Sequence, residues 1–466
     1  MYTYLLDIYD IILSPIYFLL IILLAYNYQK KMEKKNPIYK FFSAGLFVKI
    51  IGGISVVLIY IYYYKDGGDT INYYRSSLAL INMASKDFNI FSSIIFGNLS
   101  SENYSAFDNN TGYPIFFGDS NSYTVVRLTV PFILLSGKSF IVSTMLLSTF
   151  TYFGIWRLLE LFVKENKEIS NQLAFSVLFI PSVFFWGSGI LKDSYTLSAT
   201  CWLIVSFYKT FIYKQQIKFH VIVLIIGIYV LLSMKPYIFY SSFAGTVIMY
   251  AHYTLKRNKN IILKYTILPL FALIIVVGGT LLMFKLGSTS GQYSSVDGML
   301  KKASITQFDL KQDYYGGNSY DIGSFEPTLT GVIAKTPIAL TVGLFMPFIW
   351  QAKNPVMLIS GIENSILLFL FLYVVLLCTI AVFKVGFKYM LKVVFDNSLI
   401  VFSLVFSLTF AFAVGLTTAN FGALVRYKIP LIPFFLSSLF YIIYKFNKED
   451  PAKILAKKKK TAKQLK

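Results

Sequence analysis

The chain has 466 residues, of which 56% are hydrophobic, 18% are aromatic and only 14% are charged. A soluble domain carries about 25% charged residues, so this composition excludes an ordinary soluble protein. The net charge is +21. We expect this excess to attract anionic membrane lipids rather than nucleic acid, because the Lys-rich end KKKKTAKQLK has no interleaved aromatic residues on which bases stack.

Apolar runs of roughly 20 residues, the length that crosses a bilayer, recur along the chain. They predict an all-α fold, a polytopic transmembrane helical bundle of about eleven spans. Two shorter apolar stretches are predicted to be interfacial or re-entrant segments, because they are too short to cross. The spans are placed near 11–27, 41–63, 139–162, 172–189, 195–213, 219–234, 237–254, 261–284, 356–383, 397–415 and 426–444, and the short stretches at 124–136 and 337–350.

Short basic loops set the predicted orientation. They lie at 30–35, 164–167 and 256–259, and the Lys-rich tail begins at Lys445. With eleven spans these segments all fall on one side, which the positive-inside rule makes cytoplasmic. The N-terminus is then outside, the C-terminus is inside, and the whole net charge of +21 is cytoplasmic. Residues 1–446 are predicted to form a single transmembrane domain, followed by a cytoplasmic tail at 447–466.

The sequence predicts neither a cysteine or histidine metal site nor a cleaved signal peptide. Cys201 and Cys378 fall in apolar runs, and His220 and His252 stand alone, so no disulfide and no cysteine or histidine metal site is predicted. Lys30 is the first basic residue and follows the first apolar run. That run is therefore predicted to be a retained helix rather than a cleaved signal peptide.

Two long loops, 64–123 and 285–336, are predicted to lie outside, and long loops in a membrane domain are usually functional. The first begins KDGGDTINYYRSS, in which the glycines allow a tight turn that presents Asp69 at the membrane edge. Asp69 suits a general base or a metal ligand. Tyr73 and Tyr74 suit sugar stacking, and Arg75 suits a phosphate. The alternative is an Asp-capped amphipathic helix on the membrane surface.

Lys192 and Asp193 stand side by side between the apolar arms PSVFFWGSGIL and SYTLSATCWLIVSF. Charges at a membrane face are costly and often mark a substrate or ion pathway. We expect Lys192 to lie near a phosphate, and Asp193 either to pair with it or to cap the following helix; Asp193 is also taken as a catalytic candidate beside Asp69. The alternative is a solvated hairpin turn.

Further candidates share the predicted outer face. They are Arg127, Lys235, Trp350, Lys353, Glu363 and Arg426. Each Lys or Arg alone is explained by snorkelling to the interface. Together with Arg75 and Lys192, these cations suit a lipid ligand that carries a diphosphate.

The segments GGDTINYY, PSVFFWGSGILKDS and RYKIPLIPF resemble bacterial polytopic glycosyltransferases, namely the GT-C superfamily and the EpsG and Wzy-like (O-antigen polymerase-like) polymerases. The resemblance implies an enzyme of the bacterial inner membrane that uses polyprenyl-phosphate or polyprenyl-diphosphate sugars at the extracytoplasmic face. It also implies that Asp69 acts as base or divalent-cation partner, and that Arg127, Lys192 and Arg426 hold the diphosphate. The acidic loop here follows the second span, whereas in the GT-C pattern it follows the first.

No GxGxxG or GxxxxGK[ST] nucleotide fingerprint occurs in a cytoplasmic segment, which fits a lipid-linked donor better than a nucleotide sugar. The leading hypothesis is a hexosyltransferase-type glycosyltransferase or polysaccharide polymerase for the cell envelope, with a lipid-linked sugar or glycan and membrane lipids as its partners. The alternatives are a flippase or transporter of lipid-linked glycans, and a structural subunit of an envelope complex.

Overall fold

The computed structural model describes residue 6 and residues 8–64, 67–257, 296–312, 319–323 and 329–448. Within these residues every named element is a helix, and one isolated β-bridge joins Ser319 and Asn420. The predicted all-α class is thereby confirmed. The expected span at 261–284, most of the loop at 285–336 and nearly all of the tail at 447–466 lie outside the described residues.

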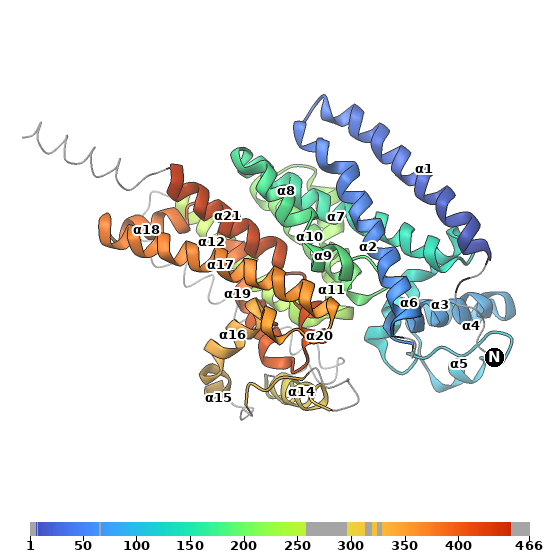
Figure 1. Cartoon of the computed structure of the whole chain (residues 1–466). Helices are drawn as coiled ribbons and strands as arrows, with labels where there is room; N and C mark the ends of the chain where they lie inside the picture. The colour runs from blue at the N-terminus through green and yellow to red at the C-terminus, as the bar shows by residue number, and fades with distance from the viewer. Residues whose placement is uncertain are drawn as a thin grey trace, which may run out of the picture. The chain divides into compact units, whose positions relative to one another are not determined.

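The chain divides into two compact units, and each is described by itself. The first unit comprises Met1–Val163 and Val177–Phe239, and the second comprises Lys164–Ser176 and Tyr240–Lys466. Figure 1 labels the helices along the chain. Up to the end of the first unit they are α1 (Ile8–Glu33), η1 (Pro37–Phe41), α2 (Phe42–Tyr62), α3 (Asp69–Lys86), α4 (Phe88–Ile95), α5 (Ser101–Ser105), α6 (Ser120–Leu135), α7 (Phe140–Glu165), η2 (Lys167–Ile169), α8 (Ser170–Leu178), α9 (Pro181–Trp186), α10 (Lys192–Phe207), η3 (Tyr208–Ile212) and α11 (Ile217–Met234). Of these, η2 and all but the last two residues of α8 belong to the second unit.

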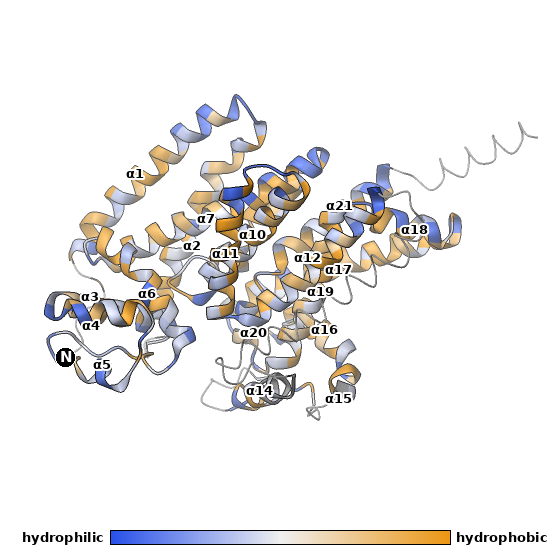
Figure 2. Ribbon diagram, turned by 180° about the vertical axis from the view of Figure 1, so that it is seen from behind, coloured by the Kyte–Doolittle hydropathy of each residue, from blue (hydrophilic) through white to orange (hydrophobic). Residues whose placement is uncertain are grey.

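The remaining helices also belong to the second unit, apart from the first residues of α12. They are α12 (Pro236–Arg257), α14 (Val296–Asp309), α15 (Leu329–Ala334), α16 (Thr336–Phe345), η8 (Ile349–Gln351), α17 (Pro355–Lys384), α18 (Phe387–Val394), α19 (Ser398–Thr417), α20 (Phe421–Tyr427) and α21 (Ile432–Lys448). Figure 2 shows hydrophobic residues along most of α17, and hydrophilic ones in the turn after α1 and at the end of α21.

Six helices in the described residues are long and apolar enough to cross a membrane, or seven if the bent pair α20 and α21 forms one span. They are Ile8–Glu33, Pro37–Tyr62, Phe140–Glu165, Ile217–Met234, Met357–Lys384 and Ser398–Thr417. The chain is therefore a multi-pass membrane protein by helix length and hydropathy. These helices coincide with spans expected from the sequence, but the structure does not show eleven.

The apolar stretch at 172–189 was predicted as one span and is instead broken. α8 ends at Leu178, Ile180 is extended, and α9 begins at Pro181. The residue before a proline is disfavoured in helical geometry, which explains the break. The stretches at 195–213 and 237–254 are helical, as α10 with η3 and as α12, but do not meet the length and hydropathy of a spanning helix.

The two short apolar stretches also form helices. Residues 124–136 belong to α6, and 337–350 begin as α16. α16 packs closely on α19 through small residues. A Cβ added to Gly343 would lie 2.0 Å from the carbonyl oxygen of Ala411, and one added to Gly415 would lie 1.9 Å from that of Ala339. Small residues of this kind let two helix backbones approach in a membrane protein.

In the first unit, α1 and α7 are joined by a buried carboxylate. Asp10 on α1 is only 3% exposed, and it accepts hydrogen bonds from the Ser139 hydroxyl (2.5 Å) and the Ile141 backbone N–H (3.0 Å). The first backbone N–H groups of a helix have no partner within the helix, so Asp10 caps α7 from another element. This contact fixes the start of α7, which follows directly on the segment that leads from α6.

Candidate functional site

The charged pair Lys192 and Asp193 opens α10 in the first unit. The chain reaches it through α9 and the segment from Gly187 to Leu191, in which Ser188, Ile190 and Leu191 are fully buried. The turn is therefore packed inside the unit rather than solvated. Asp193 occupies the first turn of α10, where the helix dipole favours a negative charge.

Asp193 pairs with Lys235, not with its neighbour Lys192. Its carboxylate oxygen lies 2.5 Å from the Lys235 amine, which stands at the end of α11. Both side chains are buried, at 0% and 6% exposed. Removing a charge from water costs several kcal/mol per ion, so such a pair holds only when each ion compensates the other. The pair joins the start of α10 to the end of α11.

Lys192 turns to a different carboxylate. Its amine lies 3.7 Å from a carboxylate oxygen of Asp119, and the two side chains are 18% and 52% exposed. Asp119 also caps α6, accepting from the Asn121 N–H and the Ser122 hydroxyl. Burial raises the pKa of Asp119, but the Ser122 hydrogen bond and the Lys192 charge outweigh it and leave the pKa below its ordinary value. Asp119 is thus ionised at neutral pH.

α6 contributes a second cation, Arg127, two turns after Asp119. Its guanidinium lies over the Tyr123 ring, 5.8 Å from the centroid. The Arg127 Nε–H is buried and donates to no partner among the described residues. Two residues further, Thr129 and Tyr195 share a hydroxyl hydrogen bond of 2.9 Å, which ties α6 to α10. Helices α6, α10 and α11 therefore bring Asp119, Lys192, Asp193 and Lys235 together.

The candidates of the first long loop lie on α3. Asp69 is its first residue and is partly exposed, as is Arg75. Gly68 before it has φ +123°, and an added Cβ would lie 2.5 Å from the Tyr60 ring, so glycine is required there. The predicted tight turn is present.

The rings of Tyr73 and Tyr74 are 2% and 7% exposed. Tyr73 lies 4.8 Å from Phe116, and Tyr74 stacks on Phe140 at 4.3 Å, with its hydroxyl donating to the Lys138 carbonyl. In this structure both rings pack within the protein, where a sugar does not reach them. Sugar stacking by either ring would require α3 to move.

Four candidates belong to the second unit. Trp350 is 74% exposed and stacks on Phe348, and Lys353 follows it as an exposed residue. Glu363 is 7% exposed within α17, whereas Arg426 is partly exposed on α20. These four residues belong to the second unit, whereas the cluster around Lys192 belongs to the first.

Sequence reasoning missed Lys428, two residues after Arg426. Lys428 is 1% exposed, and its amine donates to Asn364 Oδ1 at 2.5 Å and to the backbone oxygens of Met346 (2.9 Å) and Leu344 (3.3 Å). The carbonyls belong to the end of α16, so Lys428 satisfies orphaned helix acceptors. The feature of the sequence that could have identified Lys428 is its position as a charged residue between the apolar runs that form α20 and α21.

Lys49 has the same role in the first unit. It lies in the middle of α2, is 2% exposed, and donates to the Gly187 carbonyl and to Ser188 Oγ at 3.4 Å. Gly187 ends α9. Lys49 therefore supports the segment that leads into Lys192, and it is not itself open to a ligand.

Among the residues that the structure describes, no three Cys, His, Asp or Glu side chains gather as metal ligands. No protein-family model matches the chain, and neither a curated protein nor a solved structure matches it. The chemistry of the site therefore has to be argued from its own residues. The site consists of a partly exposed ion pair, Lys192 with Asp119, next to the buried ion pair of Asp193 and Lys235.

Proposed function

We propose that this protein is a membrane glycosyltransferase or polysaccharide polymerase that uses a polyprenyl-linked sugar donor in surface polysaccharide assembly. The observation that supports this most is the placement of Lys192. Its amine is partly exposed at the start of α10, 3.7 Å from Asp119 and next to the buried pair of Asp193 and Lys235. A cation held rigidly at a helix N-terminus suits an anionic leaving group.

In this proposal Lys192 stabilises the charge that develops on the lipid phosphate or diphosphate as the glycosidic bond breaks. Arg127, a partly exposed residue, is the second phosphate ligand, because its Nε–H has no hydrogen-bond partner among the residues that the structure describes. Asp193 is buried against Lys235 and is a positioning residue rather than a base. The acceptor hydroxyl is then oriented by a partly exposed carboxylate, Asp119 or Asp69.

The distribution of charge supports an extracytoplasmic site. Lys192 and Lys235 lie at one end of the antiparallel helices α10 and α11. The basic turn at the end of α1, with Lys30 and Lys31 in the helix and Lys34 just after it, lies at the other end of α2 from Asp69 (Figure 1). The positive-inside rule places that turn in the cytoplasm. Asp69 at the far end of α2 then lies outside, where a polyprenyl-linked sugar is presented.

The test is a transfer assay with purified full-length protein in liposomes, using lipid-linked glycan extracted from the source organism. We expect Lys192→Ala to reduce product formation by about 10²- to 10³-fold, the usual effect of losing one transition-state cation or donor. Lys192→Arg should keep part of the activity. The control is Lys86→Ala, which removes an equally charged residue from an exposed ion pair with Asp108 and should leave the rate unchanged.

A flippase remains the alternative, supported by helices that break within each unit, as at α9 and α16. Discontinuous helices are common in transporters. The same liposomes separate the two functions. A protein that moves lipid-linked glycan between leaflets but does not elongate or transfer it would contradict the transferase. Gene deletion adds an independent measurement: a missing transferase leaves short lipid-linked glycan, whereas a missing flippase leaves full units in the inner leaflet.

A further inference from the structure

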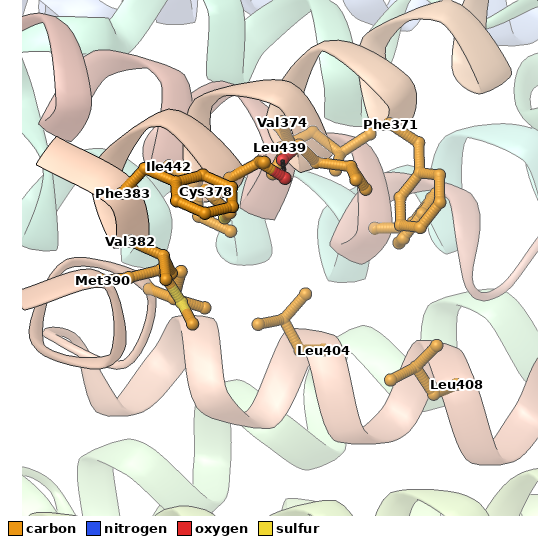
Figure 3. A pocket seen from close by; sticks show the side chains of 14 residues that line it. Phe371, Val374, Cys378, Val382, Phe383, Met390, Leu404, Leu408, Leu439 and Ile442 are labelled. Carbon is orange, nitrogen blue, oxygen red and sulfur yellow. Dashed lines mark hydrogen bonds between the residues drawn. The ribbon is translucent and has the colours of Figure 1, made fainter. Parts of the chain in front are cut away.

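The second unit contains an apolar groove of about 410 Å³ between α17, α18, α19 and α21. In Figure 3, Leu404 and Leu408 on α19 point toward the side chains of α17 and α21 across the groove. Cys378 and Thr379 on α17 are the polar members of the lining. α17 and α19 are both long and apolar enough to span a membrane, so we expect the groove to face hydrocarbon rather than water.

One end of this groove is bordered by an amphipathic helix. α18 has the sequence FKYMLKVV, and its Met390 and Val394 line the groove. Lys388 and Lys392 on the same helix are exposed, as is Lys384 at the end of α17. No carboxylate pairs with these three lysines in the described part of the chain. Three exposed lysines thus lie on the two helices, α17 and α18, that border the apolar groove.

We propose that this groove binds one acyl chain of an anionic phospholipid, whose phosphate is held by Lys388 and Lys392. The apolar lining excludes a polar ligand, and the adjacent lysines complement a negatively charged headgroup. A basic amphipathic helix at a bilayer surface is the usual geometry for this kind of recognition. The inference concerns the second unit alone and is independent of the proposed glycosyltransferase activity.

The position of the lysines also selects the leaflet. Lys256 and Lys445 pair with Asp396 just after α18, so this end of the unit gathers further basic residues. The positive-inside rule makes such an end cytoplasmic. The occupant we commit to is therefore a phospholipid of the inner leaflet, not the polyprenyl-linked substrate, which we place outside.

The experiment is native mass spectrometry of the full-length protein, delipidated in detergent and titrated with phosphatidylglycerol or phosphatidylcholine. Each lysine near a headgroup is worth about a fivefold change in binding, so Lys388→Gln with Lys392→Gln should weaken phosphatidylglycerol about 25-fold. Phosphatidylcholine binding should change little. The charge-matched control is Lys31→Gln with Lys34→Gln, two exposed residues of the first unit, which should leave both lipids unaffected.

A second part of the experiment fills the groove with a larger side chain. Leu404→Trp should abolish tight binding of one phosphatidylglycerol, whereas Phe369→Trp, at an exposed α17 position outside the lining, should not. Labelling of Cys378 by N-ethylmaleimide supplies a readout in the unaltered groove, and phosphatidylglycerol should slow it more than phosphatidylcholine does. Equal affinity for the two lipids in wild type overturns the proposal. Displacement of phosphatidylglycerol by lower concentrations of polyprenyl phosphate also overturns it, because the groove would then belong to the substrate chain.

Discussion

Removing one member of the buried pair should destabilise the protein far more than removing both. Asp193 and Lys235 lie 2.5 Å apart and are 0% and 6% exposed. At an effective dielectric constant of about 20 their attraction is about 7 kcal/mol, which offsets the desolvation of two ions. Either ion left alone retains its desolvation cost without that attraction.

The magnitudes follow from this balance. Asp193→Asn and Lys235→Met should each lower the free energy of unfolding by about 3–5 kcal/mol, as for other buried pairs broken on one side. The double variant buries no ion, and its cost is about 1–3 kcal/mol for an imperfectly bonded asparagine. Two independent losses would instead add to about 6–10 kcal/mol.

A double-mutant cycle tests this prediction with the wild type, the two single variants and the double variant. Each protein is unfolded in mixed micelles by titration with a denaturing detergent, and unfolding is followed by tryptophan fluorescence. The exposed pair Lys86 and Asp108, 2.7 Å apart with both side chains about two-fifths exposed, is the control and should show no measurable coupling. Additive losses in the Asp193 and Lys235 double variant would refute the reasoning. They would mean that water or another group compensates each charge separately.

Two further predictions concern packing and topology. Gly415→Ala should cost about 1–3 kcal/mol of stability, because its Cβ would lie 1.9 Å from the Ala339 carbonyl oxygen; Gly118→Ala, where nothing lies within 4 Å, should leave the thermal midpoint unchanged. In a chain without its two native cysteines, an impermeant thiol reagent should label Ser100→Cys in intact cells and should label Lys459→Cys only after permeabilisation. Labelling of Lys459→Cys in intact cells would reverse the orientation.

The long apolar runs of the sequence predicted much of this fold. A run of about 20 apolar residues has few structures open to it in a bilayer, because every backbone polar group must be satisfied within the segment. The helices from Ile8 to Tyr62, and those that begin at Phe140 and Ser398, therefore lie where the sequence placed them. Hydropathy did not predict the break at Ile180, because the residues on both sides of Pro181 are equally apolar.

The candidate site was predicted less completely. The sequence suggested that Asp193 either pairs with Lys192 or caps the following helix. Successive residues of a helix point in different directions, and both residues lie within α10, so each has a partner on another element. Their partners, Asp119 and Lys235, are 73 and 42 positions away and are found only through the packing of α6 and α11 on α10. Asp119 was missed because an aspartate before a helix is ordinarily explained as an N-cap.

The structure also separates cations that support the fold from those available to a ligand. Lys49 and Lys428 are almost fully buried and donate to carbonyls at the ends of α9 and α16. A helix that ends inside an apolar fold leaves acceptors that water does not reach, and a lysine amine supplies up to three donors to them. Lys192 differs from both because it retains exposure and faces a half-exposed carboxylate across 3.7 Å. Under the proposed function, depth in an apolar segment is therefore a poor guide to which lysine binds the ligand. Under the same proposal, Lys192 is distinguished by its residual exposure next to the buried pair of Asp193 and Lys235, which leaves it accessible to an anionic ligand.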